Sequence, residues 1–395
     1  MRRRPGLVAI WAFGMLVGLP ACIGGGTEAS PPTAEPGWAA HTTRDAPLDP
    51  QLLLDHRREE YGSLGGLAVV RVGNEEWHGV SGVADVSGTE IDRTTRFRVG
   101  SLTKPIVATL VLDGVANGDV SLDDTVSDLV PEVLRADPPV SVRMLLDHTS
   151  GVFDQINEGA PADIDRLADQ AMRSEARSLV RRYRDGEPVI APDRLLVALA
   201  ETHDRYFQPG TGYHYSNTNY QLAAMVLEAV TGTSLAVLLR ERIVEILGLE
   251  NTSLAPPDTE SPGLRGYVPG RREGMYDDVT DDLIGFGNGG NGGVISTGEE
   301  LLTIMQAIVS GRLLPQHLVH EMTTMTPQSN STYGLGLARY DLSCGTFFGH
   351  GGSVNGTVSL ALADLGGSRG VVIAFNLVSP ADPGLPALAD DLLCK

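Results

Sequence analysis

The chain contains little lysine, cysteine or aromatic side chain for its length of 395 residues. Only two of its 30 basic residues are lysines, Lys104 and Lys395, and it has three cysteines and 5% aromatic residues. Three cysteines exclude a disulfide-dense scaffold, and a hydrophobic content of 42% predicts a large core and excludes a disordered chain. The net charge of −20 argues against a nucleic-acid partner, because phosphate binding requires a basic surface.

The N-terminal segment has the pattern of a secretion signal. Three arginines at 2–4 precede an apolar run, 6–19, that is too short to span a membrane. The run ends in Leu19-Pro20-Ala21-Cys22, which resembles a bacterial lipobox and predicts that 1–21 are removed and that Cys22 carries lipid. The alternative is an ordinary signal peptide in which Cys22 has no role.

Residues 22–47 are rich in Gly, Pro, Thr and Ala without hydrophobic periodicity, so they are predicted to form a flexible tether. We therefore expect an exported protein, either a lipoprotein on the extracellular face of the cell membrane or a secreted protein. Contact with the membrane is expected only through the lipid anchor, and the protein is expected to be a monomer.

Two cysteines, Cys344 and Cys394, remain in the predicted mature chain. In an oxidising compartment they are expected to form a disulfide that anchors the C-terminus; two buried free thiols are the alternative. A disulfide that closes a loop of this size stabilises a protein by about 4 kcal/mol in the chain-entropy model.

Strand patterns occur near both ends of the chain, and helical periodicity dominates the middle. Strands are predicted at 67–72, 77–86, 333–340, 345–349, 354–363 and 370–377. Helices are predicted at 51–60, 104–116, 142–146, 192–202, 220–230, 235–247 and 385–393. This order predicts an α/β (α+β) fold in one domain, 48–395. One antiparallel sheet, from about 48–98 and 330–395, is flanked by helices, and a mostly helical part, about 99–329, is inserted.

Ser101 and Lys104 stand three residues apart at the start of a predicted helix. Residues at this spacing share a helix face, so the amine can reach the hydroxyl. A desolvated lysine can accept the serine proton, whereas arginine effectively never deprotonates. A chain with 28 arginines that keeps one interior lysine therefore favours a catalytic Ser-x-x-Lys pair over a chance occurrence.

Two further segments carry candidate site residues. In the first, Tyr215 and Asn217 follow a Gly-rich turn, where the phenol could relay protons and the amide could hold a substrate amide; the alternative is a turn with a helix cap. In the second, Gly349-His350-Gly351-Gly352-Ser353 lies between predicted strands, where glycines allow an extended ligand to approach a strand edge. A glycine bulge is the alternative for this segment.

Taken together, the three motifs resemble those of the serine β-lactamase and penicillin-binding protein family. The likeness is greatest to the secreted D-alanyl-D-alanine carboxypeptidases of Streptomyces and to class C β-lactamases, and it extends over about 48–395. The resemblance implies the β-lactamase/transpeptidase-like fold.

The resemblance also implies a role for each residue. Ser101 would be the acylated nucleophile, Lys104 its proton partner, and Tyr215 the base that takes protons from the serine and returns them to the leaving amine. The backbone N–H groups of Ser101 and Ser353 would form the oxyanion hole. Substrate would be bound by a set of residues from two motifs, namely Asn217, His350, Gly352 and Ser353.

Two positions depart from the carboxypeptidase pattern. Gly351 stands where that branch commonly has Thr, and Ala338 stands where it has an Arg for the terminal carboxylate. Arg339 is one residue away, and neighbouring strand residues face opposite sides of a sheet. The two departures remove a hydroxyl and a carboxylate-binding cation from the carboxypeptidase pattern, which argues against true D-Ala-D-Ala carboxypeptidase activity.

The leading hypothesis is an exported serine hydrolase that acts on a peptidoglycan stem peptide ending in D-Ala-D-Ala and that binds penicillin and other β-lactams. The alternatives are an esterase or β-lactamase with the same site, and a penicillin-binding surface module without turnover. No cofactor is expected. A metal site is not expected either, because His317, His320 and Glu321 do not form a zinc-protease motif.

Overall fold

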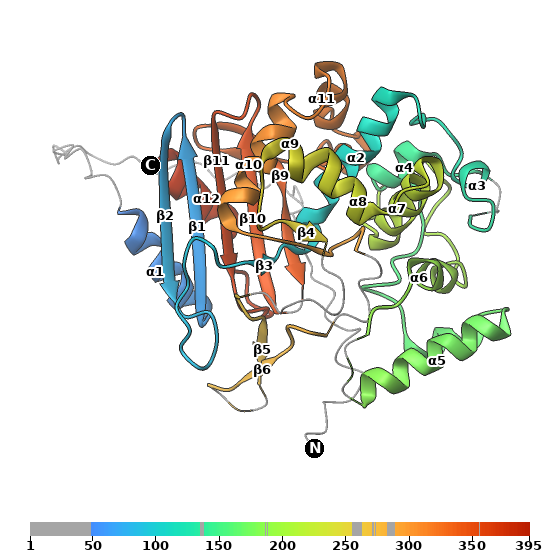
Figure 1. Cartoon of the computed structure of the whole chain (residues 1–395), viewed down its shortest axis with the longest axis horizontal. Coiled ribbons are helices and arrows are strands. Elements are labelled where there is room, and N and C mark those ends of the chain that lie inside the picture. The colour runs from blue at the N-terminus through green and yellow to red at the C-terminus, as the bar shows by residue number, and fades with distance from the viewer. Residues whose placement is uncertain are drawn as a thin grey trace, which may run out of the picture.

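The structure is a computed structural model, and it describes residues 49–395 except 135–137, 186, 188, 255–262, 271, 273, 283–288 and 355. The predicted signal, the tether and Cys22 lie outside the described residues. A six-stranded antiparallel sheet in the order β2-β1-β11-β10-β9-β8 forms one side of the molecule (Figure 1). Its strands are β1 (Gly65–Val72), β2 (Glu75–Gly82), β8 (Ala338–Leu342), β9 (Gly345–Val354), β10 (Thr357–Asp364) and β11 (Arg369–Phe375).

The alternation of side chains along the strands explains why both faces of this sheet are covered. On β1, Leu67 and Val69 belong to the main core, whereas Ala68 and Val70 belong to a second core. Helix α10 (Gly298–Ser310) packs on the first face, and α1 (Pro50–Tyr61) and α12 (Leu385–Cys394) pack on the second. The fold class predicted from the sequence is therefore confirmed: strands from both ends of the chain build one antiparallel sheet between helices.

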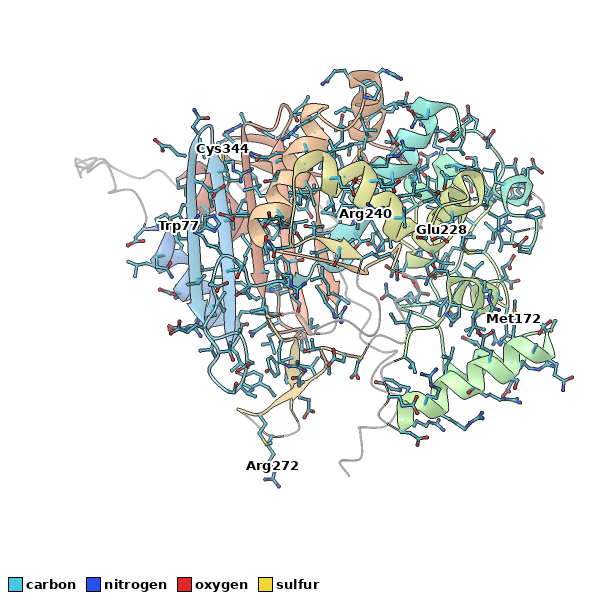
Figure 2. All side chains as sticks on the ribbon, viewed as in Figure 1. Trp77, Met172, Glu228, Arg240, Arg272 and Cys344 are labelled. Carbon is cyan, nitrogen blue, oxygen red and sulfur yellow. A yellow bond between two sulfur atoms is a disulfide. The ribbon has the colours of Figure 1, made fainter. Side chains whose placement is uncertain are left out.

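The part between the two groups of strands is mostly helical. Its main helices are α2 (Thr103–Asn117), α4 (Val142–Leu146), α5 (Gln170–Arg184), α6 (Asp193–Ala200), α7 (Asn217–Thr231) and α11 (Gln316–Thr323), with the short α3 (Val126–Leu129). Residues 235–247 form one continuous helical stretch, α8 (Leu235–Leu239), η4 (Arg240–Val244) and α9 (Glu245–Leu247). Short turns η3 (Pro161–Arg166) and η5 (Pro327–Ser329) complete it. Figure 2 shows Met172 on α5 and Trp77 on β2 at opposite sides of the molecule, so α5 is remote from the sheet.

Small strands join the two parts. β3 (Phe97–Arg98), β7 (Val294–Ser296) and β4 (Ser253–Leu254) form a three-stranded sheet, and β5 (Tyr267–Pro269) pairs with β6 (Tyr276–Asp278). Within the described ranges, no single helix is long and apolar enough to cross a membrane. Only the bent pair of α7 with 235–247, at 84°, meets that length and composition criterion jointly.

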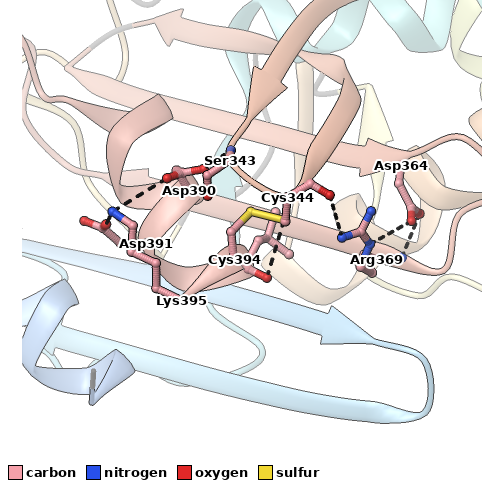
Figure 3. The surroundings of a disulfide bond; sticks show 9 residues. Ser343, Cys344, Asp364, Arg369, Asp390, Asp391, Cys394 and Lys395 are labelled. Atoms are coloured by element: carbon pink, nitrogen blue, oxygen red, sulfur yellow. Dashed lines mark hydrogen bonds and ion pairs between the residues drawn. A yellow bond between two sulfur atoms is a disulfide. The ribbon is translucent and has the colours of Figure 1, made fainter. Parts of the chain in front are cut away.

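Several predicted boundaries were wrong by a few residues. The second strand of the hairpin begins at Glu75 and ends at Gly82, and α7 begins at Asn217 rather than at 220. Val354 ends β9 instead of opening β10, and β8 begins only at Ala338. The predicted disulfide is present: Cys344 and Cys394, with Cα atoms 5.3 Å apart, tie the β8–β9 turn to α12 (Figure 3).

Two glycines allow the segment around Ser101 to approach β9. Gly100 opens the turn η2 (Gly100–Leu102) with φ of +60°, and a Cβ there would lie 2.8 Å from the backbone nitrogen of Ser353. A Cβ at Gly352 would lie 2.2 Å from the carbonyl oxygen of Val99. Any side chain at either position would push the two backbones apart, so the absence of Cβ atoms sets the width of this contact.

Candidate active site

Lys104 lies at the start of α2 and is fully buried. Its Nζ atom is 3.0 Å from Ser101 Oγ, 2.8 Å from Asn217 Oδ1 and 2.8 Å from the carbonyl oxygen of Asn291. These three contacts join the start of α2, the start of α7 and the Gly-rich 289–293 segment. The structure therefore brings together Ser101, Lys104 and Asn217, which the sequence placed in separate motifs.

Burial lowers the pKa of Lys104 to about 7, against the upward effect of the Asp154 carboxylate. A neutral amine has two N–H donors and one lone pair. Because the oxygens of Asn217 and Asn291 can only accept, they take both hydrogens and leave the lone pair directed at Ser101. In this geometry the neutral Lys104 amine can therefore accept a proton from the Ser101 hydroxyl.

The Tyr215 ring lies over the Lys104 amine. Its ring centroid is 5.0 Å from Lys104 Nζ, and its hydroxyl is in hydrogen-bonding contact with Ser101. Burial raises the pKa of Tyr215 well above its usual value, and the Ser101 contact acts in the opposite direction. Tyr215 is thus a neutral phenol that can pass a proton on. Before substrate reacts, the Lys104 amine, whose pKa is lowered, is better suited than the Tyr215 hydroxyl to accept a proton.

The loop after α4 holds the 215–219 segment through a series of contacts. His148 Nδ1 is 3.2 Å from the backbone nitrogen of Ser216, and its ring lies 4.3 Å from that of Tyr215. Burial lowers the pKa of His148 well below its usual value, so its ring is neutral and Nδ1 can accept from that N–H group. Further along the loop, Asp154 contacts the side-chain nitrogen of Asn217 at 3.1 Å.

Strand β9 forms the opposite wall. β8 pairs with β9 only from Gly345 to Gly349, so among the described residues the 350–354 stretch is paired with β10 alone. Ser353 lies on this stretch beside the Ser101 turn, as the clash distance at Gly100 indicates. An unpaired strand edge can add an extended substrate through backbone hydrogen bonds.

His350 is held away from proton transfer. Its Nε2 accepts from the Tyr333 hydroxyl at 2.9 Å, and its Nδ1 contacts the carbonyl oxygen of Gly351. Burial, with the nearby charge of Lys104, lowers the pKa of His350 to about 3. The ring is therefore neutral and fixed in orientation, which suits it to shape the wall next to the β9 edge.

Arg339 is exposed and already has an acidic partner. Along β8 the residues alternate between half-buried and exposed, with Ala338 and Tyr340 half-buried and Arg339 exposed. The Arg339 guanidinium pairs with Asp341 at 3.0 Å. The structure therefore agrees with the expectation that Arg339 faces away from the side on which Ala338 lies.

Three contributors were given no role from the sequence: Asn291, His148 and Asp154. Asn291 contributes a backbone oxygen, which no residue-type pattern identifies, and the other two reach the site from a loop more than 60 residues before Asn217. His148 has a φ of +60°, unusual for a residue with a Cβ, and it directly precedes Thr149-Ser150-Gly151. The sequence signal was the 145–151 stretch, which lies within the family resemblance, but its residue types alone assign His148 no role.

One group of side chains in the described part of the chain has metal-ligand character. Glu76, His78 and Glu299 place one ligand atom each within 4.8 Å of one another. Arg71 pairs with Glu76 at 2.5 Å, and Arg93 pairs with Glu299 at 3.1 Å. With both carboxylates already paired to arginines, this group is best described as an ion-pair network that joins β2 to α10.

Comparisons with known proteins agree with this geometry. The family described as Beta-lactamase matches residues 51–393. Esterase EstB of Burkholderia gladioli is 33% identical over 215 residues, covering 53% of this chain and 51% of the esterase. A D-aminopeptidase of Brucella anthropi is 25% identical over 307 residues, covering 75% of this chain and 52% of that protein.

Solved structures show the same fold. A D-stereospecific amidohydrolase from Streptomyces sp. superposes with a TM-score of 0.71 at 30% identity, covering 87% of this chain and 98% of that chain. The D-amino acid amidase of Ochrobactrum anthropi SV3, solved with L-phenylalanine amide, gives a TM-score of 0.71 at 24% identity, covering 87% and 96%. The chain spans about half the length of the curated relatives it matches.

The chain belongs to the Beta-lactamase family. The family resemblance inferred from the three motifs is thereby confirmed. The similar proteins named above are an esterase, a D-aminopeptidase, a D-stereospecific amidohydrolase and a D-amino acid amidase, so the finer expectation of D-alanyl-D-alanine carboxypeptidase activity is not part of this conclusion.

Proposed function

We propose that this protein is an exported serine hydrolase that cleaves small amides or esters, including amides of D-amino acids, through an acyl-enzyme on Ser101. The observation that carries the proposal is the buried Lys104 amine, whose Nζ lies 3.0 Å from Ser101 Oγ and whose two other partners are oxygen acceptors. In its neutral form this amine has a lone pair left for Ser101 Oγ. The exported location rests on the N-terminal pattern, with a lipid on Cys22 as the membrane anchor.

The proposed reaction has two halves. Ser101 Oγ attacks the substrate carbonyl while its proton passes to Lys104, and the backbone N–H groups of Ser101 and Ser353 stabilise the negative charge that forms on the carbonyl oxygen. The proton then passes through Tyr215 to the departing amine or alcohol. Water attacks the ester formed on Ser101, and the same groups return its proton to Ser101 as the acid product leaves.

The preference for amides and esters without a terminal carboxylate rests on charge. Ala338 offers no cation at the β9 edge, and Arg339 is exposed and paired with Asp341. The ring of His350 is neutral because burial lowers its pKa to about 3. A substrate ending in a carboxylate would lack a positive partner there, whereas an uncharged amide or ester would not need one.

Hydrolysis of p-nitrophenyl acetate and of D-phenylalanine amide tests the proposal, with Ser101→Ala as the variant. We expect turnover by the wild type and loss of at least about a thousandfold in the variant. Intact mass during turnover should show an acyl group on the wild type alone. Equal hydrolysis by wild type and Ser101→Ala would overturn the proposal.

Carboxypeptidase activity on D-Ala-D-Ala peptides is the second candidate, favoured by the His350-Gly351-Gly352-Ser353 motif and by the open edge of β9. A Cβ at Gly351 would have no heavy atom closer than 3.9 Å, so the backbone there leaves room for a Cβ. If the charge argument is correct, Ala338→Arg with Gly351→Thr should raise D-Ala release while leaving p-nitrophenyl acetate hydrolysis within about threefold. Strong D-Ala release by the unmodified protein would instead favour the second candidate.

A further inference from the structure

Asp154 is a buried carboxylate that the hydrolytic mechanism above does not use. It is 1% exposed and lies in the loop after α4. The contacts recorded for its carboxylate all come from N–H donors: the backbone nitrogens of Ile156 and Asn157 and the side-chain nitrogens of Asn157 and Asn217. Burial raises the pKa of Asp154, but a set of donors without an acceptor favours the ionised form.

The contact with Asn217 has a consequence for Lys104. An amide side chain presents an oxygen on one side and an NH2 group on the other, and rotation by 180° exchanges the two. Asp154 can only accept, so the NH2 group of Asn217 must face it, at 3.1 and 3.3 Å from the two carboxylate oxygens. The oxygen of Asn217 then faces Lys104 Nζ at 2.8 Å. The opposite orientation would direct two donors at the amine.

The surroundings of Asp154 support this orientation. The same loop binds the start of α7 at several neighbouring points: Ser150 Oγ contacts Asn219 Oδ1 at 2.6 Å, and the backbone nitrogen of Gln155 contacts Thr218 Oγ1 at 3.2 Å. The backbone nitrogen of Asp154 itself donates to the Tyr206 hydroxyl at 3.0 Å. Both backbone and side chain of Asp154 are thus fixed relative to Asn217.

Resting on the proposed hydrolase function, we propose that Asp154 is a positioning residue, which holds the Asn217 amide in the one orientation that offers its oxygen to Lys104. Without Asp154 the amide can rotate, and the amine loses one of the two acceptors that direct its lone pair at Ser101. The charge of Asp154 also acts on Lys104 directly and opposes the effect of burial. The other titratable groups that face this pair are neutral, namely Tyr206, Tyr215, Tyr220, His148 and His350.

The kinetic test is a double-mutant cycle on ester hydrolysis with Asp154→Ala and Asn217→Ala. If Asp154 acts through Asn217, each single variant lowers kcat/KM by about a hundredfold, mainly through kcat, and the double variant is no worse than the poorer single one. If the two effects instead multiply to about ten thousandfold, Asp154 does not act through Asn217 and the proposal fails. Thermal unfolding of each variant identifies any that fail to fold.

A second measurement needs no substrate and uses the scarcity of lysine. Protein labelled with nitrogen-15 in lysine gives two Nζ signals, of which Lys395 is an internal reference. In the conservative variant Asp154→Asn, the Lys104 pKa should fall below that of the wild type, and the acidic limb of kcat/KM should move to lower pH with it. Asp163→Asn is the matched control, because Asp163 is also buried in this part of the chain and accepts from the backbone nitrogen of Ala160.

The two measurements separate the possible failures. An unchanged Lys104 pKa in a folded Asp154→Asn protein, or the same shift in Asp163→Asn, would overturn the role of Asp154. A wild-type protein that hydrolyses nothing, in which the Lys104 pKa still falls on Asp154→Asn substitution, would overturn the proposed function and leave the link between Asp154 and Lys104 in place.

Discussion

Lys104 and Lys395 are the same residue type in opposite environments, and the two environments shift the pKa of the amine in opposite directions. Lys104 is buried, contacts three oxygens and has a pKa lowered to about 7 by burial. Lys395 is exposed at the end of α12, where the hydrogen bond to Asp391 raises its pKa (Figure 3). The first environment needs an amine that can lose a proton, and the second needs only a positive charge.

The largest difference between the two lysines is expected when each is replaced by arginine. Lys104→Arg should lower kcat/KM for p-nitrophenyl acetate by at least about a thousandfold, because a guanidinium cannot accept the Ser101 proton. Lys395→Arg is the matched control and should leave kcat/KM unchanged. Normal acylation in Lys104→Arg would mean that the buried lysine is not the base.

Removing the disulfide near Lys395 should affect stability and spare activity. The double variant Cys344→Ser, Cys394→Ser should lose about 4 kcal/mol of unfolding free energy, because the bond closes a loop with a sequence separation of 50. Since Cys344 lies at the far end of β9 from Ser353, kcat/KM should stay within about twofold well below the melting temperature. Urea unfolding and ester hydrolysis measure the two quantities, and a large fall in kcat/KM would show that the ends of β9 are coupled.

The pH dependence of hydrolysis should follow Lys104. In the proposed mechanism the neutral amine of Lys104 is the base, so kcat/KM should be highest above a pH of about 7 and should fall as the pH drops through the Lys104 pKa. The expected decrease is about tenfold per pH unit, or about a hundredfold at pH 5. If kcat/KM instead fell only around the usual pKa of lysine, the amine would not be desolvated during the reaction.

The smallest effect is expected for Lys395→Ala. Its ion pairs with Asp390 and Asp391 join an exposed lysine to half-buried carboxylates at the protein surface, and surface ion pairs contribute little to stability. The melting temperature should change by no more than about 1 °C. A larger decrease would indicate that the end of α12 is held by this charge as well as by the disulfide.

Much of the fold could be predicted because its signals are local. The alternating strands near both ends and the helices at 104–116 and 142–146 follow from periodicity within a few residues. Helix α5 was not predicted individually, since most of its residues are polar and only Ala176 and Tyr183 are buried. Helix α10, which is mostly buried, was also not predicted individually.

The same distinction applies to the site. Ser101 and Lys104 were found because their spacing places both on one helix face, and Tyr215 and Asn217 because they stand close together in the chain. Asp154 could not be found in this way, since its link to Asn217 spans 63 positions and depends on how a loop folds against α7. The Asn291 contact uses a backbone oxygen that every residue type possesses.

Gly351 and Gly352 are neighbours that tolerate change very differently. A Cβ at Gly352 would collide with the Val99 carbonyl at 2.2 Å, whereas one at Gly351 would meet nothing within 3.9 Å. The distance between the Ser101 turn and β9 is therefore set by backbone atoms, and a Cβ at the adjacent position Gly351 would not change it. In evolutionary terms, the side chain at position 351 can change while the distance between the Ser101 turn and β9 stays the same. Such a separation suits a fold shared by esterases and D-amino acid amidases.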